Sequence, residues 1–256
     1  MSGSSRDPVT FDAMTAAAPT AYSTRKKKRQ IPAWLEFVGL LVIAVTIAVV
    51  IKAFFVQMFF VPSTSMRPLF VKEDRILVQK VSYWTGDVKR GDVIVFADPG
   101  GQWLGPTEPA LNPVQKALSA VGLYPTGGHL VKRVIGVGGD HVVCCDKLGR
   151  IRVNGVPLEE KDYILKGTKP SDMDFDVMVP EDRLWVMGDN RTNSEDSRYH
   201  QTLEGGGTVP VDDVVGKVWA IVWPANRMTL LHRPDTFDNP QIDINQAQND
   251  TKVPGR

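Results

Sequence analysis

The chain has 256 residues, of which 43% are hydrophobic, so it is long enough to bury one hydrophobic core and to carry appended segments. Its 30 basic and 29 acidic residues give a formal net charge of +1. This near-neutral balance gives no electrostatic indication of a nucleic-acid partner, and we expect none.

The N-terminal part of the chain predicts a tail followed by a membrane anchor. Residues 1–30 are rich in Ala, Ser and Thr and end in a block of basic residues, which is typical of a disordered cytoplasmic tail. Residues 31–55 include fifteen uncharged, mostly apolar residues from Phe37 to Ile51. At ~1.5 Å per residue this run is shorter than a ~30 Å hydrocarbon core, so a spanning helix must also use its flanking residues. The basic block places residues 56–256 outside the cytoplasm.

Two other interpretations of the apolar segment are a cleavable signal peptide and a buried core helix. A signal peptide ends in a small-x-small cleavage site, whereas the bulky residues Phe54, Phe55, Phe59 and Phe60 follow here. We therefore favour an uncleaved, single-pass transmembrane helix.

Short runs of β-branched and aromatic residues, separated by Gly-Asp, Gly-Gly and Asn-Gly pairs, dominate residues 56–233. The predicted strands cover Arg75–Val81, Asp92–Ala97, Leu130–Val137, His141–Cys145, Ile151–Val153, Arg183–Met187 and Val215–Trp223. The pair Asn154-Gly155 predicts a type I′ hairpin. The predicted fold class is mainly β: one N-terminal transmembrane helix, then an antiparallel β-sheet domain with a small β-hairpin cap at about residues 141–180.

Two further segments are predicted to lie outside the sheet. Residues 98–129 are rich in Gly and Pro, which indicates an inserted loop, with a helix expected over Asn112–Leu123. Residues 234–256 are polar and lack a hydrophobic period, so we expect a second disordered tail.

The two cysteines, Cys144 and Cys145, are adjacent in the sequence. Consecutive Cα atoms are ~3.8 Å apart, closer than in ordinary disulfides, so a bridge between them would be unusual. Two cysteines alone do not supply the set of ligands that a zinc site needs, so no zinc site is predicted. We expect two small hydrophobic side chains in a strand, one on each face.

Three hydroxyl residues, Ser63, Thr64 and Ser65, follow one another after Pro62. A nucleophilic serine needs a base to accept its proton, and histidine is the usual one. The four histidines are His129, His141, His200 and His232. Three of them stand in loops or at turn edges, where solvated side chains are common, whereas His200 lies near an Asp and Ser cluster and remains open as a base.

Lysine is the alternative base, once its pKa falls from the ordinary value of ~10.4. Lys132 lies in an apolar strand beside Arg133, where burial and a like charge would lower the pKa of its amine. An edge-strand lysine that prevents aggregation has the same sequence pattern, and residue spacing does not distinguish the two.

A polar cluster follows the predicted strand Arg183–Met187. Residues 188–198, GDNRTNSEDSR, contain three acids, two arginines, two asparagines and two serines. Such a loop is either a solvated turn with weak surface ion pairs or a loop that Asp–Arg pairs fix in place so that it can hold a catalytic group.

These blocks, in this order, resemble the bacterial type I signal peptidases, the membrane-anchored serine proteases that remove leader peptides from exported proteins. The resemblance rests on the basic block and anchor at 25–55, PSTSMRP at 62–68, DRILVQK at 74–80, KRGDVIVF at 89–96, VKRVIGVGGD at 131–140, GDNRTNSEDSR at 188–198 and VGKVWAIVWP at 215–224. It covers the chain from about residue 25 to residue 225.

The resemblance implies a serine endopeptidase whose catalytic domain uses a Ser-Lys dyad without histidine. Ser65 matches the nucleophile and Lys132 the general base, while the Ser63 hydroxyl and the Ser65 N–H match the oxyanion hole. Ser194 matches the serine that orients the lysine. The residues that match the remaining loop-bracing positions are Asp189, Asp196, Arg198 and Arg133.

The resemblance also implies the substrate and the location. Preprotein signal peptides with small residues at −1 and −3, the A-x-A pattern, would bind as an extended strand alongside Phe59–Ser63 and Leu130–Lys132. The matching pocket positions are Phe59, Val61, Pro62, Met66, Phe70, Leu130 and Val131. The family needs no metal or other cofactor. Its members lie in the bacterial cytoplasmic membrane, with the catalytic domain on the outer face, the lipid bilayer as a partner and the protein-export machinery nearby.

The sequence departs from the family pattern around the pockets. Pro68-Leu69-Phe70 stands where the family often has PTL, Leu130 replaces an aromatic residue found in many members, and a glycine-rich loop follows His200. These departures bear on the shape of the pockets and leave the dyad intact.

Two alternatives from other classes accompany this hypothesis. A membrane-tethered β-domain that only binds a partner would need neither Ser65 nor Lys132. Another Ser-Lys protease, such as a conjugation-type processing enzyme or a self-cleaving repressor, would keep the dyad and change the substrate. The repressor is disfavoured because the anchor leaves no room for a DNA-binding module. Cleavage of a preprotein after A-x-A distinguishes these possibilities.

Overall fold

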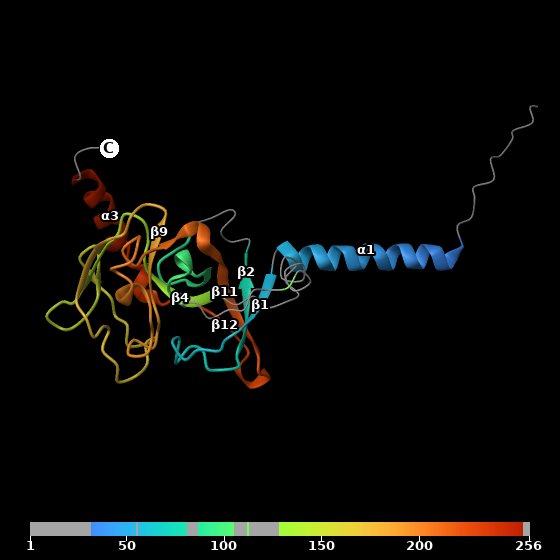
Figure 1. Cartoon of the computed structure of the whole chain (residues 1–256), viewed down its shortest axis with the longest axis horizontal. Coiled ribbons are helices and arrows are strands. Elements are labelled where there is room, and N and C mark those ends of the chain that lie inside the picture. The colour runs from blue at the N-terminus through green and yellow to red at the C-terminus, as the bar shows by residue number, and fades with distance from the viewer. Residues whose placement is uncertain (1–31, 55, 81–86, 105–111, 113–127, 253–256) are drawn as a thin grey trace, which may run out of the picture. The chain divides into compact units, whose positions relative to one another are not determined.

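The computed structural model describes residues 32–54, 56–80, 87–104, 112 and 128–252 (Figure 1). The chain divides into two units, Met1–Ile43 and Ala44–Arg256. The predicted tail of residues 1–30 and, apart from its first residue, the predicted helix Asn112–Leu123 lie outside the described residues.

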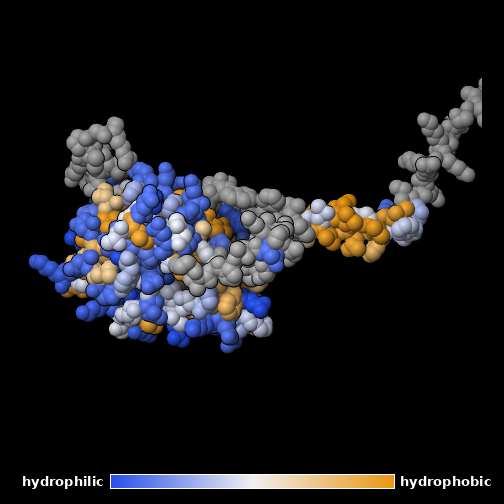
Figure 2. All heavy atoms as spheres, in the orientation of Figure 1, coloured by the Kyte–Doolittle hydropathy of each residue, from blue (hydrophilic) through white to orange (hydrophobic). Residues whose placement is uncertain are grey.

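Helix α1 covers Ala33–Phe54, the segment predicted as the anchor. Its described side chains are exposed and mostly apolar, among them Trp34, Phe37 and Leu40, and Figure 2 shows this hydrophobic surface along the helix. Across the residues that the structure describes, no helix combines the length and the apolar character that a membrane crossing requires. The transmembrane span therefore stays a prediction.

An antiparallel sheet forms the larger part of the second unit, and the fold is mainly β. Its strands, in spatial order, are β1 (Val56–Phe60), β2 (Arg75–Gln79), β11 (Val214–Trp223), β3 (Val93–Ala97), β4 (His129–Gly136), β9 (Arg183–Met187) and β10 (Val209–Pro210), and β12 (Thr229–Leu230) pairs with β11. The predicted strands in this sheet are confirmed to within one or two residues. Strand β1 was not predicted as a strand.

A second antiparallel sheet contains β7 (Val156–Pro157), β6 (Arg152–Val153), β5 (His141–Cys144) and β8 (Phe175–Met178), in that order. The predicted hairpin joins β6 to β7. Its two central residues, Asn154 (φ 52°) and Gly155 (φ 81°), both have the positive φ that a type I′ turn requires, which confirms the turn type.

The buried apolar side chains form three clusters, and β4 contributes to all of them because its side chains alternate between the two faces of the sheet. Leu130 and Val134 belong to one cluster with Phe96 and Trp103. Val131 packs against a second cluster, which includes Met66 below the hydroxyl segment. This packing fixes the strand that carries Lys132.

The C-terminal segment differs from the prediction of a disordered tail. Asp235–Asp238 form the short helix η6, and Pro240–Lys252 form helix α3. Phe237 and Ile242 are buried in the cluster of the second sheet, and the Asn154 side chain donates a hydrogen bond to the Ile242 carbonyl at 3.1 Å. Two buried apolar residues, together with hydrogen bonds such as those from Asn245 and Gln246 to backbone carbonyls, therefore fix a segment that is otherwise polar.

The cysteine pair also differs from the prediction. Cys144 and Cys145 form a disulfide between neighbours instead of remaining two separate small side chains. Cys144 is buried in the cluster of the second sheet, and Cys145 packs against the same cluster. Because the bond between their sulfurs holds them together, both side chains pack in the same hydrophobic core.

Candidate active site

A cavity of about 1220 Å³ opens along β1, the hydroxyl segment and the first half of β4. Ser63, Ser65, Lys132 and Ser194 all line it. The structure thus brings together four residues from three distant parts of the sequence. Among the described residues, no group of three or more His, Cys, Asp or Glu side chains could hold a metal ion.

Ser65 lies in the turn that follows β1, and its side chain is largely buried. The Ser65 N–H donates a hydrogen bond to Ser63 Oγ at 3.1 Å. The two predicted oxyanion donors are therefore adjacent and bonded to one another. The Ser63 hydroxyl still keeps its own proton for another acceptor.

Lys132 lies on β4 and is only 4% exposed, so its amine has lost nearly all contact with water. The pKa of Lys132 is lowered to about 8. Burial is the main cause, the Asp196 carboxylate opposes it, and the Arg198 guanidinium acts in the same direction as burial. An exposed lysine keeps a pKa of ~10.4, so this site holds a far larger neutral fraction near physiological pH. A neutral amine accepts a proton, which is what a general base must do.

Ser194 contributes a buried hydroxyl to the same cavity. Its Oγ has no hydrogen-bond partner among the described residues. A buried polar atom without a partner costs about 1–3 kcal/mol, so its retention indicates a use that this state of the molecule does not satisfy.

Gly188 allows Ser194 and the nucleophile segment to approach one another. A Cβ at position 188 would lie 2.5 Å from the Ser65 carbonyl oxygen and 2.6 Å from Ser194 Cβ, and would also collide with Ser194 Oγ. These separations are far below van der Waals contact. Only glycine fits here, and its missing side chain sets the distance between the two serines.

Two asparagines fix the backbone of the hydroxyl segment. The Asn190 N–H donates to the Ser65 carbonyl at 2.9 Å, and Asn190 Nδ2 donates to the Thr64 carbonyl at 3.1 Å. Asn193 Nδ2 donates to Thr64 Oγ1 at 2.8 Å. The Thr64 hydroxyl is therefore held by the catalytic loop, which we define as residues 188–198.

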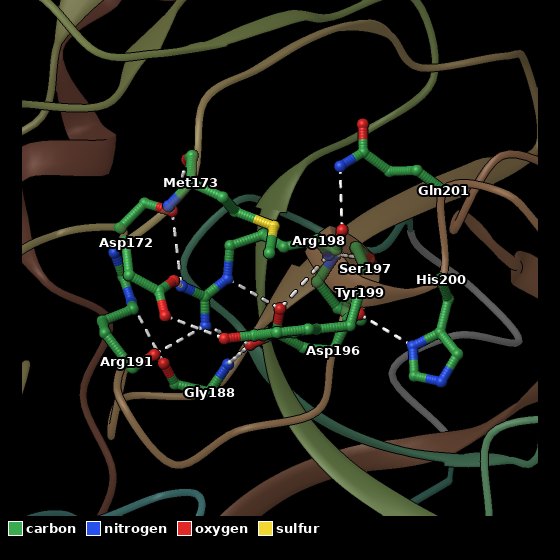
Figure 3. Close-up of polar contacts among 12 residues, drawn as sticks. Asp172, Met173, Gly188, Arg191, Asp196, Ser197, Arg198, Tyr199, His200 and Gln201 are labelled. Atoms are coloured by element: carbon green, nitrogen blue, oxygen red, sulfur yellow. Dashed lines mark hydrogen bonds and ion pairs between the residues drawn. The ribbon is translucent and has the colours of Figure 1, made fainter.

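Buried ion pairs hold the catalytic loop itself, and Figure 3 shows one group of them. Arg198 donates two hydrogen bonds of 2.9 Å to the Asp196 carboxylate, which also accepts the Gly188 N–H at 3.0 Å. Arg133 donates two hydrogen bonds, of 2.8 and 2.7 Å, to Asp189. The four predicted loop-bracing residues therefore form two complete pairs.

A third buried ion pair joins the catalytic loop to the segment that follows β7 of the second sheet. Arg191 donates to Glu160 at 2.6 Å and to the Gly188 carbonyl at 3.0 Å. Burial alone would lower the pKa of Arg191, but the Glu160 carboxylate raises it above its ordinary value. The Tyr163 ring lies under the Arg133 guanidinium at 4.7 Å and also faces Arg191. Sequence reasoning missed Glu160 and Tyr163, because nothing local marks a contact across about 30 residues.

The predicted pocket residues lie on the cavity wall with one exception. Phe59, Val61, Pro62, Met66, Leu130 and Val131 line the cavity. Phe70 is fully buried in the cluster that contains Met66 and does not appear on the wall formed by the described residues, so the prediction for it was wrong. A phenylalanine after a turn has the same local pattern whether it faces a cavity or the core.

His200 has a structural environment. Its Nδ1 lies 2.8 Å from the Asp196 carbonyl, and its ring stacks on Trp103 with centroids 4.3 Å apart. Trp103, Leu104, His129 and Tyr199 also line the cavity and were not predicted to do so. The Gly- and Pro-rich composition around Trp103 suggested only a loop.

Comparisons with known proteins agree with this geometry. The family described as Signal peptidase, peptidase S26 matches residues 34–223. The chain is 38% identical over 244 residues to a probable signal peptidase I of Mycobacterium leprae, covering 82% of this chain and 83% of the relative. It is 42% identical over 217 residues to a signal peptidase I of Mycobacterium tuberculosis, covering 75% and 73%. Signal peptidase I U of Bacillus subtilis is 32% identical over 212 residues, covering 80% and 95%. On these matches, the chain belongs to the signal peptidase family, peptidase S26.

Proposed function

We propose that this serine endopeptidase works as a signal peptidase I that cleaves preproteins after A-x-A sites, with Ser65 as nucleophile and Lys132 as general base. The observation that carries the proposal is the environment of Lys132. A lysine that is 4% exposed, with a pKa lowered to about 8, lines the same cavity as a largely buried serine. A structural lysine would gain nothing from losing its charge beside a hydroxyl.

The proposed reaction is acyl transfer. Neutral Lys132 Nζ takes the proton of Ser65 Oγ while this oxygen attacks the scissile carbonyl carbon. The Ser63 hydroxyl and the Ser65 N–H stabilise the oxyanion that forms, once the N–H turns from Ser63 Oγ to the substrate.

The tetrahedral intermediate then collapses, and the lysine ammonium gives its proton to the leaving amine. The signal peptide is left as an ester on Ser65. Lys132, neutral again, takes a proton from water, whose oxygen attacks the ester and releases the acid. Ser194 Oγ, which needs a partner, would orient Lys132 through both steps.

The substrate would bind as an added strand beside β4. Strand β3 pairs with β4 along Leu130–Lys132, but β9 pairs with β4 only from Arg133 onward. In the described part of the chain, the other side of Leu130–Lys132 therefore faces the cavity instead of another strand. An extended peptide could use this edge for backbone hydrogen bonds, and the pockets would read alternate side chains.

The proposed place of action is the outer face of a bacterial cytoplasmic membrane, near the export machinery, with α1 as the anchor. The basic block, the uncharged run and the exposed apolar side chains of α1 support this location. Met58 and Phe60, close in sequence to Ser65, are each 54% exposed, as expected of residues that work beside lipid. Signal peptides of preproteins and the bilayer would be the partners.

The test is cleavage of a purified preprotein that carries an A-x-A site, by the full chain in detergent or lipid. We expect Ser65→Ala and Lys132→Ala to abolish cleavage, whereas Lys147→Ala, which removes an exposed lysine in a turn, retains it. Mass spectrometry of the product gives the cleaved bond, and thermal unfolding checks that each variant is folded. Full activity of either dyad variant, or cleavage only at other sites, would contradict the proposal.

A further inference from the structure

The segment that leaves β3, Asp98–Leu104, is held in a defined shape. Asp98 Oδ1 accepts the Trp103 N–H at 2.8 Å, and Asp98 Oδ2 accepts the Leu104 N–H at 3.0 Å. Gly100 and Gly101, with φ of 62° and 68°, provide the left-handed conformations of the turn between them. One carboxylate therefore positions two consecutive bulky residues.

Trp103 connects this segment to the catalytic loop. It is 6% exposed, packs edge-on against Phe96 with centroids 5.8 Å apart, and stacks on His200. His200 is bonded in turn to the backbone of Asp196. The indole is thus held by two aromatic neighbours, and a fixed aromatic side chain loses little entropy when a ligand binds beside it.

Leu104 and Trp103 both contribute to the cavity wall, together with His129 and Leu130 at the start of β4. Leu104 is 44% exposed, so part of its apolar surface is available to a ligand. The cavity of about 1220 Å³ exceeds the ~300–1,000 Å³ typical of small-molecule pockets. It has room for more of a peptide than the small side chains at −1 and −3.

The strand spacing says which part of a peptide would reach this wall. His129 precedes Lys132 by three residues, which is about 10 Å along a strand. In a substrate strand that runs parallel to β4 with residue −1 beside Lys132, the residue beside His129 is −4. The wall would then meet the substrate at −4 and just beyond.

We propose that Trp103 and Leu104 form an additional apolar subsite at substrate positions −4 and −5, which binds the one of these two side chains that an extended strand turns toward the wall. The proposal rests on the proposed function, because it assumes an extended signal peptide beside β4. Burial of an apolar side chain against the indole and the leucine would add binding free energy at these positions. The enzyme would therefore prefer apolar over polar residues there, in addition to small residues at −1 and −3.

The experiment compares two peptides that share an A-x-A site and differ only at −4 and −5, which are both Leu in one and both Ser in the other. We expect wild-type kcat/KM to favour the Leu peptide by roughly tenfold, the effect of one well-placed apolar contact. Leu104→Ser should remove most of this preference, chiefly by lowering kcat/KM for the Leu peptide. Leu148→Ser, which changes a 76% exposed leucine in a remote turn, is the matched control and should keep the preference.

Trp103→Phe and Trp103→Ala complete the design. The phenylalanine variant should retain part of the preference and the alanine variant should lose it, with folding followed by near-ultraviolet circular dichroism. Equal cleavage of both peptides by the wild type, or an unchanged preference in Leu104→Ser, would overturn the subsite. Failure of the wild type to cleave either peptide after A-x-A would instead refute the proposed function.

Discussion

The pKa of Lys132 gives a sharp prediction for the pH dependence of cleavage. If the neutral amine is the base, kcat/KM must follow the neutral fraction of Lys132. With a pKa of about 8, this fraction is about one tenth at pH 7 and about nine tenths at pH 9, so activity should rise about tenfold over this range. Activity should fall as the pH drops through 8, because protonation removes the base.

The magnitude follows from the burial of the side chain. A lysine with the ordinary pKa of ~10.4 would be neutral in less than about 0.1% of molecules at pH 7. Burial therefore increases the fraction of molecules with a neutral Lys132 by more than about a hundredfold at pH 7. It lowers the free energy of unfolding by ~1.36 kcal/mol per unit by which the pKa falls. The cost arises because the protonated amine favours the unfolded chain.

The assay is initial-rate cleavage between pH 6 and pH 10, with a blocked peptide that has no titratable group in this range. Glu195 raises the pKa of Lys132, so Glu195→Gln should move the acid limb to lower pH. Lys147→Ala should leave the profile unchanged. A flat profile between pH 6 and pH 9, or an acid limb centred near 10.4, would refute the assignment of neutral Lys132 as the base.

Three other predictions concern the frame around the site. Gly188→Ala should lower kcat by on the order of 10²-fold or more, because the added Cβ displaces Ser194 and the Ser65 carbonyl; a rate near wild type would refute this steric role. Arg90→Met removes the two hydrogen bonds, of 2.7 and 2.6 Å, that Arg90 donates to the buried Asp140 carboxylate and leaves this charge without its cation, so we expect a loss of about 3 kcal/mol in denaturant unfolding, which Arg90→Lys partly restores. Cys144 and Cys145 should resist alkylation in the folded, unreduced protein and react after reduction, as mass spectrometry would show; alkylation without reductant would contradict the disulfide.

The sequence predicted most of the sheet because the strand residues themselves carry the signal. The sequences of β3 and β4 are rich in β-branched and apolar residues and are bounded by glycine, so these strands can be recognised from local sequence alone. Strand β1 was missed because its apolar residues continue from the helix without a turn signal. Helix α3 was missed because its mean hydropathy is low and only contacts from distant residues fix it.

The same distinction applies to the candidate site. Ser65, Lys132 and Ser194 were proposed because their motifs occur in a recognisable order, and the structure places all three on one cavity wall. No role was predicted for Asn190 of the catalytic loop, because its partner Thr64 lies 126 residues away in the sequence. The cavity wall at Trp103 depends equally on a contact with a distant residue, and no local pattern reports such a contact.

Under the proposed mechanism, the buried arginines explain how the catalytic loop can be rigid without stabilising the protonated form of Lys132. Asp196 fixes the loop by accepting hydrogen bonds from Gly188 and Arg198, but its charge raises the pKa of Lys132. Arg198, bound to the same carboxylate, lowers that pKa and so offsets part of the effect. An ion pair in this position supplies directional bonds with a weaker net field than the carboxylate alone. The Asp196 carboxylate alone would keep its bond to Gly188, but it would stabilise the protonated lysine, which could not accept the Ser65 proton in the proposed mechanism.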